Sequence, residues 1–142
     1  MSFTESSSGQ SVGTITFLMT DVEGSTQLWE RFPDAMSHSM LRHHTVVHEE
    51  IRNWGGHLPP DQGEGDSVVG AFGDVDHALS CAVRVQQTLA NESWPASIEI
   101  RVRIALHTGE GWVHEGGNYF GTAITQAPPR EGSSLGFLRM TA

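Results

Sequence analysis

The sequence predicts an α+β fold in a single domain, with strands and helices in the order β-α-β-β-α-β. Three observations lead to this prediction. Residues 98–107 have a large apolar side chain at every second position, and all the residues between them except Ala105 are polar, as in a half-buried strand. Two segments, 36–54 and 78–89, repeat apolar side chains at helical spacing. Residues 14–20 are rich in β-branched and aromatic side chains and end at the turn sequence DVEGS.

The first half of the chain is predicted to form a strand followed by two helical segments. After the turn, Ser25 or Thr26 is placed to cap the first helix. A proline then interrupts that helix, and Asp34 is placed to cap the next one. The glycine pair Gly55-Gly56 is expected to end the second helix. Its apolar face comprises Met36, Met40, Val47, Ile51 and Trp54.

The second half supplies the remaining strands and one more helix. We expect a short strand over 57–62 and another over 66–72, joined by a glycine-rich turn. Asp74 or Asp76 can cap the next helix, and the alternating strand follows it. This order is the split βαβ arrangement of ferredoxin-like folds. The apolar face of the helix comprises Ala78, Ala82, Val85 and Leu89.

Composition and charge limit the classes of function. A chain of 142 residues is long enough for one domain with a hydrophobic core. Eight Lys+Arg against seventeen Asp+Glu give a net charge of −9, and an acidic surface repels a nucleic-acid backbone. The single cysteine, Cys81, fits a reducing compartment and is expected to be buried. No apolar run approaches the roughly 20 residues that cross a bilayer. We therefore expect a cytoplasmic protein with no nucleic-acid or membrane partner, and a disordered leader over residues 1–12.

Two aspartates stand at the ends of predicted strands: Asp21 ends the first, and Asp66 begins the third. The first and third strands are plausible neighbours in the sheet, so both carboxylates are expected at one rim. Oxygen ligands suit Mg²⁺ or Mn²⁺, which keep coordination places for water and phosphate oxygens. Gly63 and Gly65 would let the chain turn tightly and leave room for a phosphate. The spacing alone leaves a second interpretation open, in which both aspartates are simply turn formers.

Three motifs in this order carry a family resemblance. They are TITFLMTDVEGST, then WGGH followed by QGEGDSVVGAF, then IRVRIALHTGEGWV followed by GGNYFGTAI. With this order and spacing the chain resembles the catalytic domain of class III nucleotidyl cyclases, of the bacterial adenylyl cyclase type. The resemblance covers about Thr14 to Ile124 and implies a cyclase homology domain over residues 13–126.

The resemblance also implies a reaction, a cofactor and an assembly. ATP would be converted to 3′,5′-cyclic AMP and pyrophosphate by two-metal-ion catalysis with Mg²⁺ or Mn²⁺. Asp21 and Asp66 match the metal-binding aspartates of the family, and the backbone carbonyl of Val22 is a further expected ligand. Each active site of the family takes residues from two subunits, which implies a head-to-tail homodimer.

Two positions that bind the adenine ring in the family carry amides in this sequence. Gln62 stands where the family adenylyl cyclases usually have a lysine, and Asn118 where they usually have its aspartate partner. An amide can donate or accept, depending on its orientation, so discrimination between adenine and guanine should weaken. The alternative for both residues is a polar turn without a ligand.

The match to the family ends near Thr125. Thr125 stands at the catalytic position of an asparagine that stabilises the transition state, and Pro129 at the position of an arginine. Arg130 is one residue away, which on a helix is about 100° of rotation. Residues 127–142 show no periodicity and are expected to be an irregular tail after an altered reading frame or gene, so that the fold is incomplete at its C-terminal end. Three hypotheses stay open: a weak adenylyl cyclase, a catalytically dead pseudo-cyclase that binds nucleotide and metal or dimerises, and a fold remnant that stays monomeric.

Several other polar side chains receive structural interpretations. His44 and His48 are one helical turn apart, but the glutamate of a zinc-protease helix is absent, so a solvated helix face is preferred to a zinc site. His107 is expected on the polar face of the alternating strand. On the same face, Arg101 and Arg103 are expected at a solvated or dimer-facing edge, with a triphosphate contact as the alternative.

Overall fold

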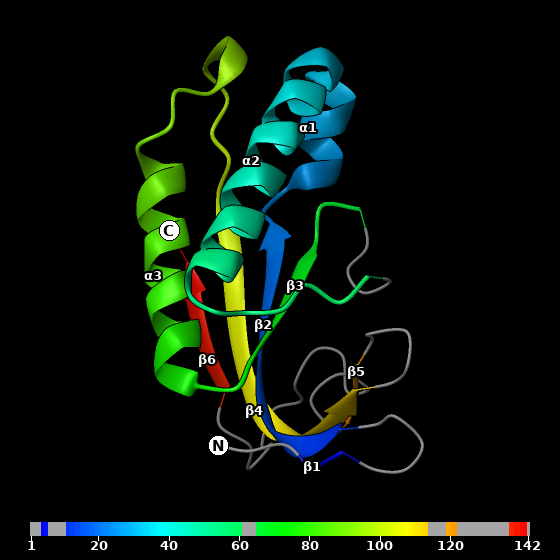
Figure 1. Cartoon of the computed structure of the whole chain (residues 1–142). Coiled ribbons are helices and arrows are strands. Elements are labelled where there is room, and N and C mark those ends of the chain that lie inside the picture. Colours follow the sequence, from blue (N-terminus) through cyan, green and yellow to red (C-terminus); the bar gives the residue numbers. More distant parts are fainter. Residues whose placement is uncertain (1–3, 6–10, 61–64, 114–118, 122–136, 142) are drawn as a thin grey trace.

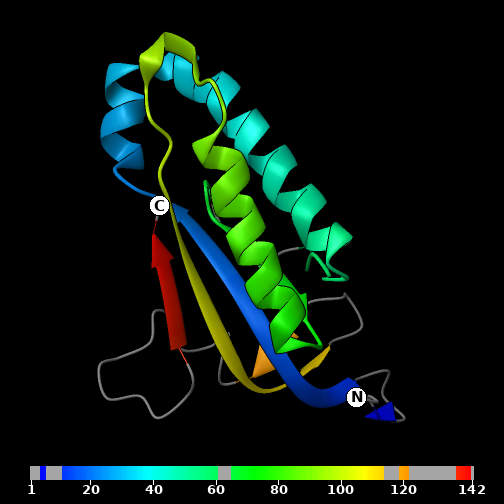
Figure 2. The same ribbon diagram turned by 90° about the vertical axis from the view of Figure 1, so that its left-hand side faces the viewer.

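A computed structural model describes residues 4–5, 11–60, 65–113, 119–121 and 137–141 (Figure 1). Within these residues a six-stranded antiparallel sheet carries the helices on one face (Figure 2). The predicted α+β fold is therefore confirmed. Along the chain the elements are β1 (Thr4–Glu5), β2 (Ser11–Val22), α1 (Ser25–Arg31), α2 (Pro33–Asn53), β3 (Val68–Phe72), α3 (Val75–Ala90), a 3₁₀ turn (Pro95–Ser97), β4 (Val102–Val113), β5 (Tyr119–Gly121) and β6 (Phe137–Thr141).

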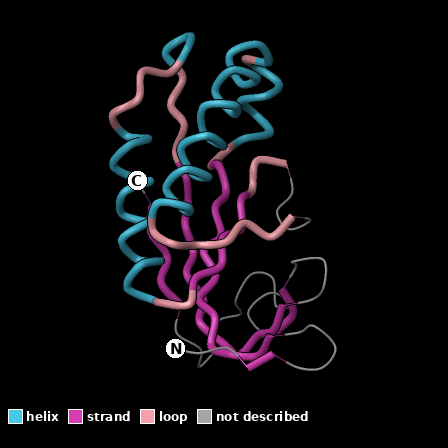
Figure 3. The backbone as a smooth tube through the Cα atoms, in the orientation of Figure 1, coloured by secondary structure: helices cyan, strands magenta, loops and turns pink. Residues whose placement is uncertain are grey.

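Two long strands, β2 and β4, form the centre of the sheet and pair along twelve residues each. On the other edge of β2, β3 pairs with residues 16–20 and β1 with residues 11–12. On the other edge of β4, β6 pairs with residues 103–107 and β5 with residues 111–113. The tube in Figure 3 shows that β1 and β5 lie at the end of the sheet away from α1.

The pairing of β2 with β3 confirms that the first and third predicted strands are neighbours in the sheet. The short strand predicted over 57–62 is wrong in extent. Within the described residues, this segment contacts the sheet ladder only through one bridge, between His57 and Ala71. The two residues exchange two backbone hydrogen bonds there. Residues 61–64 lie outside those residues.

The strand predicted from the alternating pattern begins later and ends later than the pattern suggests. Its first residue is Val102, which is paired with Val22 at the end of β2. Residues 98–101 extend past the end of β2 and therefore do not belong to the ladder. Their apolar side chains, Ile98 and Ile100, are nevertheless buried, as the alternating pattern predicts.

The helices bury the apolar stripes that their spacing predicts. Helices α2 and α3 lie side by side against one face of the sheet (Figures 1 and 2). Trp54, at the end of α2, is partly buried against this core. The buried residues of the two helices are Met36, Ser39, Met40, His43, Val46, Val47 and Ile51 in α2, and Ala78, Cys81, Ala82, Val85 and Leu89 in α3.

The ends of the helices agree with the sequence in two cases out of four. Asp74 caps α3, since its Oδ1 accepts hydrogen bonds from the backbone N–H groups of Asp76 and His77, the second and third residues of the helix, at 2.8 and 3.4 Å. Gly55, with φ 76°, ends α2 in the left-handed conformation that glycine adopts without strain. The predicted caps of α1 and α2 are wrong. Gly24 precedes α1 without a side-chain bond, and α2 begins at Pro33, whose fixed φ suits the first helical position, so that Asp34 lies inside the first turn.

Two segments predicted to be irregular contain strands. Within the expected leader lie β1 and the start of β2, and within the expected tail lies β6. A short edge strand needs only a neighbouring ladder for its backbone groups and not an amphipathic pattern of its own, so periodicity cannot reveal it. The domain boundaries at residues 12 and 126 stay a prediction.

Both faces of the sheet contribute to the core. The larger cluster joins the helices to alternate residues of β2, including Leu18 and Val22. The smaller cluster lies on the other face and contains Ile15 and Phe17. His107, expected on a polar face, is 1% exposed; its placement was predicted wrongly because it pairs with Phe17 and shares that buried face.

Candidate functional site

The predicted rim brings the two aspartates to the same end of adjoining strands. Asp21 is the penultimate residue of β2, and Asp66 lies two residues before β3. The last pair of the β2–β3 ladder joins Thr20 to Val68, so the chain on either side carries both aspartates past the end of the ladder. A side-chain bond then fixes Asp66: its Oδ2 accepts the backbone N–H of Val22 at 3.2 Å.

The chain before β3 is shaped to reach this position. Gly65 has φ 59°, a left-handed conformation that a side chain disfavours, and it directly precedes Asp66. Residues 61–64, including Gly63, lie outside the described residues. The described part of the turn therefore supports the sequence interpretation that glycine steers the chain here.

Asp21 has a cationic neighbour on the central strand. The β2–β4 register places Arg103 directly opposite Asp21, and Arg103 Nη2 donates to Asp21 Oδ2. The two side chains are partly exposed, at 36% for Arg103 and 45% for Asp21. The sequence did not predict this pair, since it indicated a solvated or dimer-facing edge for Arg103, with a triphosphate contact as the alternative. Its near neighbour Arg101 does lie exposed, at 59%, and pairs with Glu99 at 3.0 Å.

A cavity of about 370 Å³ adjoins Asp66 between the first two helices and the β3 turn. Its hydroxyl-bearing side chains, Ser25 and Thr26, come from the start of α1, and its imidazole, His44, comes from α2. A space of this size next to a carboxylate and two hydroxyls can take part of a polar ligand. The lining residues are Ser25, Thr26, Trp29, Met40, His44, Gly65 and Asp66.

The histidines of α2 are less solvated than the sequence suggested. His43 is fully buried, and burial together with the adjacent His44 lowers its pKa to about 4. His44 Nδ1 lies 2.7 Å from the carbonyl oxygen of Met40, and burial lowers the pKa of His48. Among the described residues no three His, Cys, Asp or Glu side chains are placed to hold one metal ion, so these histidines give no support to a zinc site.

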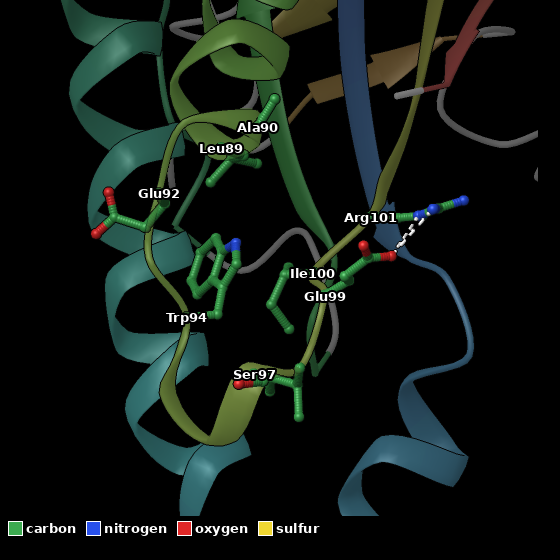
Figure 4. Close-up of a pocket in the computed structure, with 9 residues that line it drawn as sticks. Leu89, Ala90, Glu92, Trp94, Ser97, Glu99, Ile100 and Arg101 are labelled. Atoms are coloured by element: carbon green, nitrogen blue, oxygen red, sulfur yellow. Dashed lines mark hydrogen bonds and ion pairs between the residues drawn. The ribbon is translucent and has the colours of Figure 1, made fainter.

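A second cavity lies beyond the C-terminal end of α3 and holds neither aspartate (Figure 4). It measures about 350 Å³, with Leu89 and Ile100 among its apolar walls and Trp94 beside them. The acidic residue Glu92 on its rim is bound to Arg42 of α2 at 2.8 Å. The other acidic residue of the cavity, Glu99, is paired with Arg101 at 3.0 Å, and the cavity carries none of the predicted site residues.

Three of the predicted site residues lie outside the described residues: Gln62, Asn118 and Thr125. Their roles stay predictions. The described part of the site therefore consists of Asp21, Val22 and Asp66, and it joins them at one rim.

The donor set of this rim fits a hard divalent cation. It offers two carboxylates and the backbone carbonyl of Val22, all oxygen ligands, and partial exposure leaves room for water or phosphate oxygens. No thiolate is available to this rim from the described residues, because Cys81 is buried in α3 and burial raises its pKa to about 12.

Comparison with known sequences gives relatives of two kinds. An uncharacterized protein of Mycobacterium tuberculosis is 42% identical over 98 residues, which are 69% of this chain and 32% of that protein. The adenylate cyclase of Lachancea kluyveri is 35% identical over 86 residues, 61% of this chain and 5% of the enzyme. That of Schizosaccharomyces pombe is 30% identical over 124 residues, 82% of this chain and 7% of the enzyme. This chain thus spans about a third of the mycobacterial relative and a small part of the fungal enzymes, and no family model matches it.

Cyclases are among the solved structures that share this fold. An adenylate cyclase from Trypanosoma brucei in its monomeric state has a TM-score of 0.71 at 23% identity, covering 80% of this chain and 66% of that one. An adenylate/guanylate cyclase/hydrolase from Silicibacter pomeroyi has a TM-score of 0.67 at 25% identity, covering 81% and 67%. The catalytic core of a rhodopsin-guanylyl cyclase with converted specificity, in complex with ATPαS, has a TM-score of 0.69 at 16% identity, covering 82% and 70%.

These comparisons confirm both the predicted fold and the predicted resemblance to class III nucleotidyl cyclase catalytic domains. No helix in the described part of the chain is both long and apolar enough to cross a membrane.

Proposed function

We propose that this chain is a nucleotidyl cyclase domain that converts ATP to 3′,5′-cyclic AMP and pyrophosphate. One observation carries the proposal: on a cyclase fold, the Asp66 carboxylate binds the backbone of Val22, which places it beside Asp21 at one rim. In the reaction, O3′ of the ribose forms a bond to the α-phosphorus while the bond to the pyrophosphate oxygen breaks. The hydroxyl proton passes to solvent.

The residues of the rim would hold Mg²⁺ or Mn²⁺ through the carboxylates of Asp21 and Asp66 and the carbonyl of Val22. When bound, such a cation neutralises phosphate charge and lowers the barrier to deprotonating the attacking hydroxyl. The side chain of Asp66 is already oriented by its bond to Val22, so its carboxylate needs little reordering to act as a ligand.

The remaining parts of the proposal rest on the sequence motifs. Gln62 and Asn118 would bind the adenine ring, and Thr125 would stand at the transition-state position. The site would be completed across a head-to-tail homodimer. The names of the fungal relatives, which are adenylate cyclases, support ATP as the substrate. The guanylyl cyclases among the structural neighbours make GTP the competitor to test.

A second candidate is a pseudo-cyclase that binds nucleotide and metal, or dimerises, without turnover. The observation that favours it is Thr125 and Pro129 at the positions of the asparagine and arginine of the family. Losing a group that meets developing charge in a transition state reduces rates by about 10²–10³.

A cyclase assay with ATP and with GTP, in excess Mn²⁺, separates the two candidates. The unmodified chain is expected to form cyclic AMP slowly, and Asp21→Ala to lower the rate about a hundredfold or more, since a metal ligand is lost. Glu23→Ala is the matched control, because Glu23 is an exposed carboxylate of the same turn and is not a proposed ligand. Nucleotide binding without product in any variant would establish the pseudo-cyclase instead.

A further inference from the structure

Asp21 and Arg103 form an ion pair across the two central strands of the sheet. Both lie on the sheet face opposite the helices, where the register of the central strands sets them directly across from each other. The guanidinium Nη2 donates to Asp21 Oδ2. With both side chains partly exposed, the pair stands in contact with solvent at the rim.

The same carboxylate cannot serve two cations equally well. A guanidinium bound to Asp21 neutralises the charge that would attract a divalent cation, and two cations within a few ångströms of each other repel. Asp66 has no such cation in the described residues: the bond recorded for its carboxylate is to the Val22 amide, a neutral donor. The two proposed ligands therefore differ, with Asp66 held by a neutral group and Asp21 by a charged one.

The Arg103 side chain can move away from Asp21 into solvent. Its side chain is 36% exposed, so the displaced guanidinium can turn into water without being buried unpaired. Arg101 offers a comparison two residues earlier on the same face: it is paired with Glu99 and not with either proposed ligand.

We infer that Arg103 is a resident counter-cation of Asp21, which holds the carboxylate in place and which a divalent cation must displace. Arg103 is in this sense a positioning residue that lowers the affinity of the rim for the metal. The inference rests on the proposed function in one respect, that Asp21 is a metal ligand.

The test is a Mn²⁺ titration of the whole chain, followed by the electron paramagnetic resonance signal of free Mn²⁺. Arg103→Gln is expected to lower the dissociation constant about three- to tenfold, the range set by loss of one partly exposed ion pair. Arg101→Gln removes the same charge two residues away and is expected to change it less than twofold. Asp21→Asn is expected to weaken binding in either background.

A second readout follows the guanidinium itself. In a ¹⁵N spectrum of arginine side chains, the Nε–H signal missing from Arg103→Gln belongs to Arg103. That signal is expected to shift when Mg²⁺ is added to the unmodified chain and to stay in place in Asp21→Asn.

The outcomes separate this inference from the proposed function. If the unmodified chain binds Mn²⁺ and Arg103→Gln binds it equally or more weakly, the displacement is wrong while the metal site stands. If no variant binds Mn²⁺, both the inference and the metal-dependent function are overturned.

Discussion

The two faces of the sheet are equally well buried at their centre but differ in how exposed their side chains are at the end where β2 terminates. Under the helices, Leu18 and Val22 of β2 are 0% and 1% exposed, so this face is core up to the last residue of the strand. On the other face, Phe17 is also 0% exposed, yet Asp21, four residues later, has 45% of its side chain exposed. One side of a single strand is thus core at one end and a candidate site at the other.

The neighbouring strand β4 shows the same gradient. On this face the side chains pass from exposed Arg101, directly before the strand, through partly exposed Arg103 to buried His107. The helix-covered face shows no such change, since Val102, Ile104 and Leu106 are all buried. A face that is uniformly covered serves stability, whereas a graded face combines a stable base with an accessible rim.

The largest expected effect tests whether the sheet face opposite the helices is a core that stabilises the fold, as the helix-covered face is. Phe17→Ala is expected to lower the free energy of unfolding by about 3–5 kcal/mol, as the loss of a fully buried aromatic side chain does. Leu18→Ala, its neighbour on the helix-covered face, should cost a similar amount, about 2–5 kcal/mol. Urea unfolding of both variants measures the two costs side by side.

Leu41→Ala is the control, because Leu41 lies on α2 with 72% of its surface exposed and should change stability by no more than about 0.5 kcal/mol. A cost below about 1 kcal/mol for Phe17→Ala, with a large one for Leu18→Ala, would mean that only the helix-covered face holds the fold together.

Much of the helix-covered face could be predicted from the sequence, because helical spacing is a local signal. The apolar stripes of α2 and α3 were predicted in this way and are confirmed. The adjacency of β2 and β3 was predicted from the order of the elements and is also confirmed. The Asp74 cap was also predicted and is confirmed, and it depends only on hydrogen bonds from residues two and three positions later in the chain.

The graded face could not be predicted, because its burial depends on partners far away in the chain. His107 is buried through a pairing with Phe17, 90 positions earlier, and nothing near His107 reveals it. The pair of Arg103 with Asp21 has the same origin, a register between strands that are separated in the chain by three α-helices and a third strand. Of the candidate site, the sequence placed Asp21 and Asp66 at one rim but could not supply the charge that faces Asp21.

His43 sharpens the comparison, because it is a titratable group buried on the helix-covered side. Its pKa is about 4 in the folded chain, against an ordinary value of 6.5, mainly because burial disfavours the imidazolium. At a pH between these two pKa values, His43 is protonated in the unfolded chain and neutral in the folded chain. The free energy of unfolding is therefore expected to fall as the pH drops from about 6.5 towards 4, by on the order of 3 kcal/mol in full.

His43→Leu should remove this part of the pH dependence, measured by urea unfolding at several pH values between 4 and 7. His38→Leu is its control, since His38 is an exposed histidine on the same helix and should leave the dependence unchanged. The assignment to His43 is wrong if His43→Leu loses stability with falling pH as steeply as the unmodified chain.

The smallest effect concerns how tightly the helix-covered face is packed. A Cβ added at Gly70 of β3 would lie 2.8 Å from Cδ1 of Ile51 on α2, closer than side chains approach. Gly70→Ala is therefore expected to cost about 1–3 kcal/mol by overpacking. Ile51→Val removes the carbon that stands in the way, at a cost of about 0.5–1.5 kcal/mol when made alone.

The double variant Gly70→Ala, Ile51→Val should then be more stable than the sum of the single costs predicts, because the second change relieves the first. Ile15→Val provides the matched background on the opposite face, where its deleted methyl group lies in the other cluster and should add to Gly70→Ala without coupling. Equal coupling in both backgrounds would mean that the strain spreads through the whole sheet, and the two faces would then not be independent cores.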